Sequence, residues 1–114
     1  MQGERLAEKH LRRKGLKLLA RRFSAPVGEL DLVMRDGRTI VFVEVKTLSD
    51  RRFKDPQDQV TPAKQRKLFR IAQWYLHHKK LDDRPCRFDV TSVVIPREGE
   101  VEIEHFEDAF LPPR

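Results

Sequence analysis

The stretch GELDLVMRDGRTIVFVEVK, residues 28–46, decides the fold of this chain. It predicts two β-strands joined by a tight turn at Asp36-Gly37, because Asp-Gly between alternating apolar residues is the strongest local signal for a hairpin. With Asp36 and Gly37 as the two loop residues, Arg35 pairs with Arg38, and the pairing continues down both strands. The chain is therefore expected to be organised around a β-hairpin.

This register sorts the side chains of the hairpin onto two faces, because successive residues of a strand point to opposite sides. Glu29 then lies opposite Glu44, and Asp31 lies opposite Phe42. One face is apolar and is expected to pack in the core; it carries Leu30, Leu32, Met34, Val41, Val43 and Val45. The other face mixes charged and apolar side chains; it carries Glu29, Asp31, Glu44 and Lys46 beside Val33, Ile40 and Phe42.

Three carboxylates and a lysine on a partly apolar face indicate a metal site. Like charges opposed across a strand pair destabilise a sheet, and carboxylates that share a site raise each other's pKa. A divalent cation removes that repulsion. Mg²⁺ suits such a site because it takes hard oxygen ligands, needs only one or two carboxylates and keeps waters that a phosphate can replace. The alternative is a polar sheet face on which glutamate and lysine form salt bridges, and the pattern alone leaves both open.

The length of 114 residues predicts a single domain, residues 1–114. A chain of this size buries roughly two-thirds of its unfolded surface, which is enough for one core without disulfides. The single cysteine, Cys86, excludes an internal disulfide and favours a reducing compartment. Nothing in the sequence resembles a signal peptide or a run of about 20 apolar residues. We therefore expect a soluble cytoplasmic protein that does not bind a membrane.

The charges are segregated along the sequence. Residues 1–23 carry a net charge of +6 and residues 51–80 a net charge of +7, whereas residues 24–50 and 81–114 carry −2 and −5. Two basic segments thus flank the acidic strand pair. Lys and Arg side chains bind polyanions because they release counterions. The distribution predicts a nucleic-acid partner whose phosphates approach the carboxylates; the alternative is that these charges only solvate helix faces.

Periodicity and turn residues predict the remaining elements. Helices are expected at residues 2–14 and 61–80, a loop at 47–61, and further strands at 16–23, 87–96 and 101–106. The segment from Lys46 to Arg87 is long enough to make the two strands that it joins parallel. The predicted fold class is α/β, a single domain with a mixed sheet and the order helix, strand, hairpin, helix, strand, strand.

The second predicted helix begins at Thr61-Pro62, a capping residue followed by proline at the first helical position. One side of this helix is apolar, and the other is a basic face formed by Lys64, Arg66, Lys67 and Arg70. We expect Lys64, Lys67 and Arg70 to contact the phosphates of a nucleic acid. Trp74 lies on the same helix. Base stacking is one interpretation of this tryptophan, and packing at the edge of the core is the favoured one.

The spacing of the charged strand residues is similar to that of a known motif. Asp31 stands thirteen positions before Glu44-Val-Lys46, which resembles the Asp…(Asp/Glu)-x-Lys motif of the PD-(D/E)XK nuclease superfamily. The longer strings GELDL and VFVEVK, at residues 28–32 and 41–46, are similar to the YraN-like bacterial family within that superfamily, which is related to archaeal Holliday-junction resolvases. The chain departs from the superfamily pattern in one respect, because Leu30 and not proline precedes Asp31.

This resemblance covers nearly the whole chain and implies an αβββαβ core with one added C-terminal strand. It also implies that Asp31 and Glu44 hold Mg²⁺ or Mn²⁺ and that Lys46 orients or activates the attacking water. Glu4, on the first helix, stands where the related resolvases carry an acid that reaches the metal. Glu29 is expected either to contact the metal ligands without touching the metal itself, or to bind a second ion.

The leading hypothesis is a Mg²⁺-dependent endonuclease-like protein that acts on DNA, with branched or junction DNA as a candidate substrate. A non-catalytic nucleic-acid-binding accessory module of DNA-processing machinery is the alternative, and an RNA-processing nuclease of the same fold is a third hypothesis. Intact Asp31, Glu44 and Lys46 favour the enzyme, whereas the lack of an evident base-reading element favours an auxiliary role. The sequence leaves open both a homodimer and a protein partner from such machinery.

Overall fold

The structure is a computed structural model that describes residues 2–50 and 60–111. Within them the chain forms α1 (Gln2–Arg13), β1 (Lys17–Ala25), β2 (Gly28–Asp36), β3 (Thr39–Leu48), α2 (Pro62–His78), β4 (Cys86–Val94) and β5 (Glu102–Phe110). The strands make a sheet of order β1-β2-β3-β4-β5. β3 and β4 are parallel, and the other neighbouring pairs are antiparallel. The predicted α/β class, with a mixed sheet and a C-terminal strand, is confirmed.

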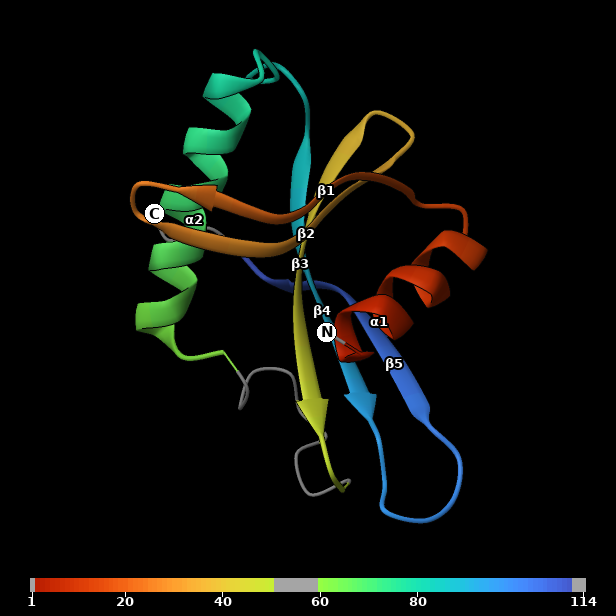
Figure 1. Ribbon diagram of the computed structural model, residues 1–114. Helices are drawn as coiled ribbons and strands as arrows, with labels where there is room; N and C mark the ends of the chain where they lie inside the picture. The colour runs from red at the N-terminus through yellow and green to blue at the C-terminus, as the bar shows by residue number, and fades with distance from the viewer. Residues whose placement is uncertain (1, 51–59, 112–114) are drawn as a thin grey trace.

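Each helix covers one face of the sheet and buries an apolar stripe there (Figure 1). The core on the α2 side contains Leu30, Val33, Ile40, Phe42, Val60, Leu68, Phe69, Ile71, Ala72, Tyr75, Phe88 and Val90. The core on the α1 side contains Ala7, Leu11, Leu16, Leu32, Met34, Val41, Val43 and Val93. Strand β3 supplies residues to both cores, because its successive side chains point to opposite faces. The acidic residue Glu44 therefore sits on a strand that is buried on both sides.

The start of α1 is fixed against the end of β3. Gly3, Ala7 and Leu11 recur at intervals of four and are all buried, so this ridge of the helix faces the sheet. A Cβ atom at Gly3 would collide with the side chain of Thr47. Only glycine allows the helix to approach β3 this closely, and α1 therefore begins directly against Thr47, near the end of β3.

Helix α2 begins as its sequence predicts. Thr61 has extended backbone angles, and its hydroxyl accepts a hydrogen bond from the backbone N–H of Lys64 at 3.2 Å. Pro62 follows at the first helical position, where the missing N–H costs nothing. This cap fixes where Lys64 lies relative to the end of β3.

The predicted hairpin exists, but its turn is displaced by one residue in each strand. Asp36 pairs with Thr39 and Arg35 pairs with Ile40, so the loop residues are Gly37 and Arg38. Gly37 has a φ of 60°, which suits the first loop position of a type II′ turn. Asp36 stays in the strand, where its carboxylate accepts a hydrogen bond from Arg87 at 3.1 Å. The predicted pairings of Arg35 with Arg38, Glu29 with Glu44 and Asp31 with Phe42 are therefore wrong.

The corrected register changes which acids are neighbours. Val33 pairs with Phe42 and Leu32 pairs with Val43, where the pairing of β2 with β3 ends. Because the slip amounts to two residues in total, the predicted faces survive it. One further step of the same register brings Asp31, and not Glu29, level with Glu44.

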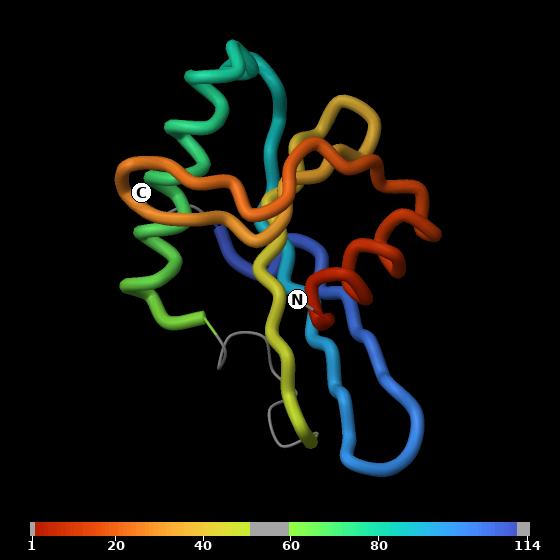
Figure 2. Tube along the Cα trace, in the orientation of Figure 1, coloured from red at the N-terminus to blue at the C-terminus, as the bar shows by residue number. Residues whose placement is uncertain are grey.

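Leu30 is an exception to the predicted faces. It packs in the core on the α2 side with Val33, and not with Leu32 and Met34. The part of β2 that precedes Leu32 pairs only with β1, where Phe23 lies opposite Leu30. This part is a two-stranded ribbon, and such ribbons twist more than wide sheets. The β1–β2 hairpin accordingly curves toward α2, as the orange segment of the trace shows (Figure 2).

The structure describes only the two ends of the loop that was predicted at residues 47–61. Strand β3 continues into its first positions and ends at Leu48. Residues 51–59 lie outside the described residues. At the other end of the chain, β5 is longer than predicted and reaches Phe110, which packs against the core on the α2 side.

Candidate active site at Asp31 and Glu44

Asp31 and Glu44 meet on the α2 side of the sheet. The backbone N–H of Val45 donates to Asp31 Oδ2 at 2.9 Å, which ties the end of the β2 pairing to β3. The two carboxyl groups share a hydrogen bond, and the side chain of Glu44 is only 9% exposed. Two acids that hydrogen-bond to each other in a buried place cannot both be ionised at low cost.

The acid pair takes up a proton near neutral pH. Burial raises the pKa of Asp31 to about 7, and the hydrogen bond to the Glu44 carboxylate and its negative charge add to that rise. Burial also acts to raise the pKa of Glu44, but the hydrogen bond from Asp31 and the nearby ammonium of Lys64 outweigh it, so this pKa is lowered. Asp31 is therefore the protonated partner and Glu44 the charged one.

Two lysines complete the cluster. Lys64 Nζ lies 3.0 Å from Glu44 Oε2, and the Lys46 amine lies close enough to Lys64 for the two groups to affect each other's pKa. Burial lowers the pKa of Lys46, and the neighbouring charge of Lys64 lowers it further. Burial acts in the same direction on Lys64, but its contacts with Lys46 and Glu44 prevail and raise its pKa. Lys46 is thus the amine that gives up a proton more readily, as a general base requires.

The structure thus brings four of the residues singled out from the sequence together: Asp31, Glu44, Lys46 and Lys64. The other two acids are engaged elsewhere. Glu29 is exposed and accepts from the Ser24 hydroxyl at 3.3 Å, and Glu4 accepts from Arg22 at 3.0 Å. Across residues 2–50 and 60–111, no group of three or more His, Cys, Asp and Glu side chains is arranged around a common metal position. The roles of Glu4 and Glu29 as metal ligands stay predictions.

Arg22 is a residue that the sequence did not single out. The hydrogen bond to Glu4 and the charge of Glu4 raise its pKa, and the charges of Glu29 and Asp31 raise it further. Arg22 therefore stands within electrostatic reach of all three acids. Its φ of 46° is uncommon for a residue with a side chain. No local sequence signal marks such a residue, because its partner Glu4 is on another element.

The basic face of α2 is divided by the structure. Lys64 points into the acid cluster, whereas Arg66, Lys67 and Arg70 are exposed. The Lys67 side chain passes over Gly28, where a Cβ atom would lie 2.9 Å from Lys67 Cε. Trp74 packs against Phe23 with ring centroids 5.7 Å apart and stacks on His78 at 4.6 Å. This position agrees with packing at the edge of the core.

Asp89 is another buried acid of the sheet, and its contacts are structural. It is fully buried, and it accepts hydrogen bonds from Arg87 at 3.1 Å and from the backbone N–H of Asp108 at 3.1 Å. Its other oxygen lies 2.7 Å from Nε2 of His105. These contacts fasten the edge strand β5 to β4. Asp89 pairs with Val43 of β3, so it lies on the α1 side of the sheet, opposite to the Asp31–Glu44 pair.

The donor set of the acid cluster fits a hard divalent ion. Glu44 Oε2 is buried and, among the described residues, has no partner with hydrogen-bond geometry, although Lys64 balances its charge. Asp31 offers a second carboxylate oxygen once its proton leaves. Mg²⁺ and Mn²⁺ accept two carboxylate ligands together with water. Asp31 and Glu44 are the residues that would hold such an ion.

The fold and this cluster define a class of protein: a small single-sheet α/β protein that is consistent with the nuclease-like PD-(D/E)XK fold. The chain belongs to the Uncharacterised protein family UPF0102, whose family model matches residues 3–93. That membership is consistent with the superfamily placement. A UPF0102 protein of Syntrophotalea carbinolica is 49% identical over 95% of this chain and 87% of its own length. A UPF0102 protein of Geotalea daltonii is 44% identical over 95% of this chain and 85% of its own length.

A solved structure is also similar in part. The structure of Pyrococcus furiosus SfsA in complex with Ca²⁺ matches 91% of this chain at 15% identity, with a TM-score of 0.42. This chain spans 60% of that chain. Neither α1 nor α2 has the length and apolarity that a helix needs to cross a membrane.

Proposed function

We propose that this protein is a metal-dependent endonuclease-like enzyme that acts on DNA. The observation that carries the proposal is the cluster of Asp31, Glu44, Lys46 and Lys64, in which two carboxyls and two amines meet beside the basic side of α2. Phosphodiester hydrolysis needs both charges: carboxylates to hold a cation and amines to neutralise the phosphate. Branched or junction DNA is part of the proposal only as a candidate substrate.

The residues of the cluster would divide the work of hydrolysis. Asp31 and Glu44 would hold Mg²⁺ or Mn²⁺, which when bound supplies positive charge to a phosphate oxygen and acidifies a water. Lys46, whose pKa burial lowers, would accept or orient a proton of the attacking water. Lys64 would leave Glu44 for a phosphate oxygen once the ion balances the acid. Arg66, Lys67 and Arg70 would hold the backbone at the exposed side of α2.

One observation favours the non-catalytic alternative. The Lys64–Glu44 ion pair already gives the charged acid a cation, so the cluster is electrostatically satisfied without a metal. A nucleic-acid-binding accessory module would need no more than this. The two candidates differ in whether divalent metal changes the protein.

The deciding experiment is a cleavage assay with Mg²⁺ or Mn²⁺ on duplex, single-stranded, flap and four-way-junction DNA. The variants are Asp31→Asn, Glu44→Gln and Lys46→Met, with Glu100→Gln as a matched control on an exposed loop. We expect cleavage that requires metal, that all three site variants lose and that the control keeps. No cleavage of any substrate by folded wild-type protein, together with intact DNA binding, would establish the accessory role instead.

A further inference from the structure

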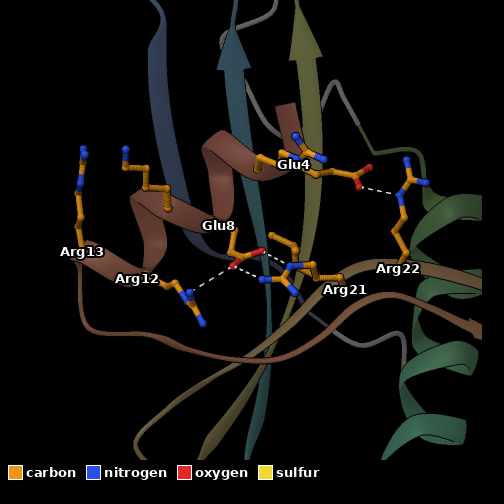
Figure 3. Close-up of a pocket in the computed structure, with 9 residues that line it drawn as sticks. Glu4, Glu8, Arg12, Arg13, Arg21 and Arg22 are labelled. Atoms are coloured by element: carbon orange, nitrogen blue, oxygen red, sulfur yellow. Dashed lines mark hydrogen bonds and ion pairs between the residues drawn. The ribbon is translucent and has the colours of Figure 1, made fainter. Parts of the chain in front are cut away.

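A second charged site lies on the other side of the sheet, between α1 and β1. It is an open cleft of about 820 Å³, within the range of about 300–1,000 Å³ that is usual for ligand sites. Six cationic side chains line it: Arg5, Lys9, Arg12, Arg13, Arg21 and Arg22. Its acids are Glu4 and Glu8, which reach from α1 toward the arginines of β1 (Figure 3).

Helix α1 has three ridges of side chains, and each faces different surroundings. The ridge Gly3-Ala7-Leu11 is buried against the sheet. The next ridge, Glu4-Glu8-Arg12, faces β1. The third, Arg5-Lys9-Arg13, is exposed and lines the cleft. Because residues four apart lie on one line of a helix, the third ridge is a row of three cations at intervals of about 6 Å along the axis.

Both acids of the cleft form ion pairs with arginines outside the row Arg5-Lys9-Arg13. Glu8 accepts from Arg21 at 2.6 Å and 2.9 Å and lies 3.6 Å from Arg12. Glu4 accepts from Arg22 at 3.0 Å. Among the described residues, Arg5, Lys9 and Arg13 form no ion pair with an acid. Their row is therefore an uncompensated positive surface.

Such a row weakens the helix that carries it. Like charges at intervals of four residues destabilise a helix by about 0.2–0.5 kcal/mol for each pair. The fold does not need the row, because the buried ridge and the two ion-paired glutamates already attach α1 to the sheet. A polyanion would remove the repulsion between the cations, and a linear array suits a chain of phosphates better than one small anion.

The cleft also lies next to the acid cluster. Arg22 lines the cleft. On β1 it stands between Arg21 and Phe23, whose partners on β2, Leu32 and Leu30, flank Asp31, so it lies level with Asp31 on the neighbouring strand. A strand that leaves the α2 side of the site thus meets further cations when it passes Arg22. We propose that the α1–β1 cleft binds the phosphodiester backbone of the nucleic acid whose scissile region lies at Asp31 and Glu44. This inference rests on the proposed function and adds a second backbone-binding surface to it.

The test compares two double variants that each remove two positive charges. Lys9→Ala/Arg13→Ala removes two cations of the row, and Arg38→Ala/Arg97→Ala removes two exposed cations that do not line the cleft. Calorimetric titration with a 12-nucleotide DNA strand in EDTA measures binding without cleavage. We expect the cleft variant to bind about tenfold more weakly at low salt and to flatten the salt slope by about two units. The control should stay within about twofold of wild type.

A variant that removes a negative charge from the cleft, and should therefore raise its affinity for DNA, strengthens the test. Glu8→Gln releases Arg21 and Arg12 from their acid, so we expect DNA to bind about threefold more tightly. Glu100→Gln makes the same change of charge on an exposed loop and should have little effect. Circular dichroism in the same buffer establishes that each variant is folded; Lys9 and Arg13 are exposed, so the double variant tests the cleft even if Glu8→Gln unfolds.

The outcomes distinguish a failure of the cleft proposal from a failure of the proposed function. If Lys9→Ala/Arg13→Ala binds DNA like wild type while Lys67→Ala/Arg70→Ala does not, the cleft proposal is overturned and the proposed function stands. If the cleft variant loses affinity for inorganic tripolyphosphate but not for DNA, the cleft is a small-anion site and the proposal is likewise overturned. If wild type binds no DNA even at low salt, both fall together.

Discussion

Lys64 of α2 lies 3.0 Å from the buried carboxylate of Glu44 on β3. This contact joins the second helix to the sheet at the acid cluster and gives Glu44 a cation in the absence of metal. A lysine that the sequence assigns to the phosphates of a ligand is thus also a structural partner of the acid. Binding of a metal or a phosphate at the cluster must therefore change what Lys64 contacts.

The first prediction concerns Lys64→Met. The substitution leaves a buried negative charge without its nearest cation, so we expect the free energy of unfolding in EDTA to fall by about 1–3 kcal/mol. Chemical denaturation measures it. Glu44→Gln in the Lys64→Met background should recover most of the loss, because no charge then needs compensation. A double variant as unstable as Lys64→Met would show that Lys64 contributes by packing and not by charge.

The second prediction is a pH dependence that belongs to Asp31. The pKa of Asp31 rises from an ordinary value of 3.8 to about 7 in the folded protein. Between these values the folded state holds a proton that the unfolded chain has released, so the free energy of unfolding falls as the pH rises through this window. Relative to Asp31→Asn, we expect wild type to lose on the order of 1–2 kcal/mol from pH 4 to pH 7.5, because the site is partly screened by solvent.

Denaturation of both proteins across that range in EDTA measures this difference, with Glu100→Gln as a control for the general effect of removing an acid. Glu44 acts in the opposite sense, because its lowered pKa contributes stability that disappears as the pH falls below its unfolded value. Asp31 contributes to that lowered pKa, so the Glu44 effect differs between the two proteins at the acid end of the range. At the upper end Glu44 is ionised in both, and the difference there belongs to Asp31. A difference that stays flat from pH 4 to pH 7.5 would mean that Asp31 ionises normally.

The third prediction separates an enzyme from a binding module. Mg²⁺ or Mn²⁺ should raise the melting temperature of wild type, since a ligand that binds only the folded state stabilises it by mass action. Asp31→Asn and Glu44→Gln should abolish that rise, whereas Glu100→Gln, on an exposed loop, should retain it. Thermal melts with and without metal give the answer, and an equal rise in every variant would place the ion elsewhere.

The fourth prediction concerns the salt dependence of DNA binding. Lys67 and Arg70 are exposed, whereas Lys64 is engaged with Glu44. We therefore expect Lys67→Ala and Arg70→Ala each to flatten the slope of log affinity against log salt by about one unit, and Lys64→Ala to flatten it less. Lys79→Ala, beyond the end of α2, is the matched control. Equal effects of all four substitutions would indicate a diffuse attraction with no defined surface.

Local sequence patterns were sufficient for much of the sheet. The alternation of residues 28–46 predicted the faces of the hairpin, and these survived a register error because the error was two residues and the side-chain period is two. The cap at Thr61 and Pro62 likewise predicted where α2 begins. Such features depend on neighbours in the chain.

Features that depend on the relative placement of elements were not predictable in this way. Leu30 departs from the alternation because the β1–β2 ribbon twists toward α2 beyond its pairing with β3. Lys64 points into the acid cluster because of how α2 is rotated against the sheet. The pairing of Glu4 with Arg22 joins residues on α1 and β1 and has no local signature. The last two contacts set the charge balance around the acids.

The position of Trp74 has a spectroscopic consequence. It is the single tryptophan of the chain, 36% exposed, and it rests on Phe23 and His78 at the contact between α2 and β1. Its fluorescence therefore reports on the α2 side of the sheet alone. A nucleotide that settles along Lys67 and Arg70 passes close to this fluorophore, whereas one held only in the α1–β1 cleft lies across the sheet from it. The protein thus carries an intrinsic probe that tells which of its two basic surfaces is occupied.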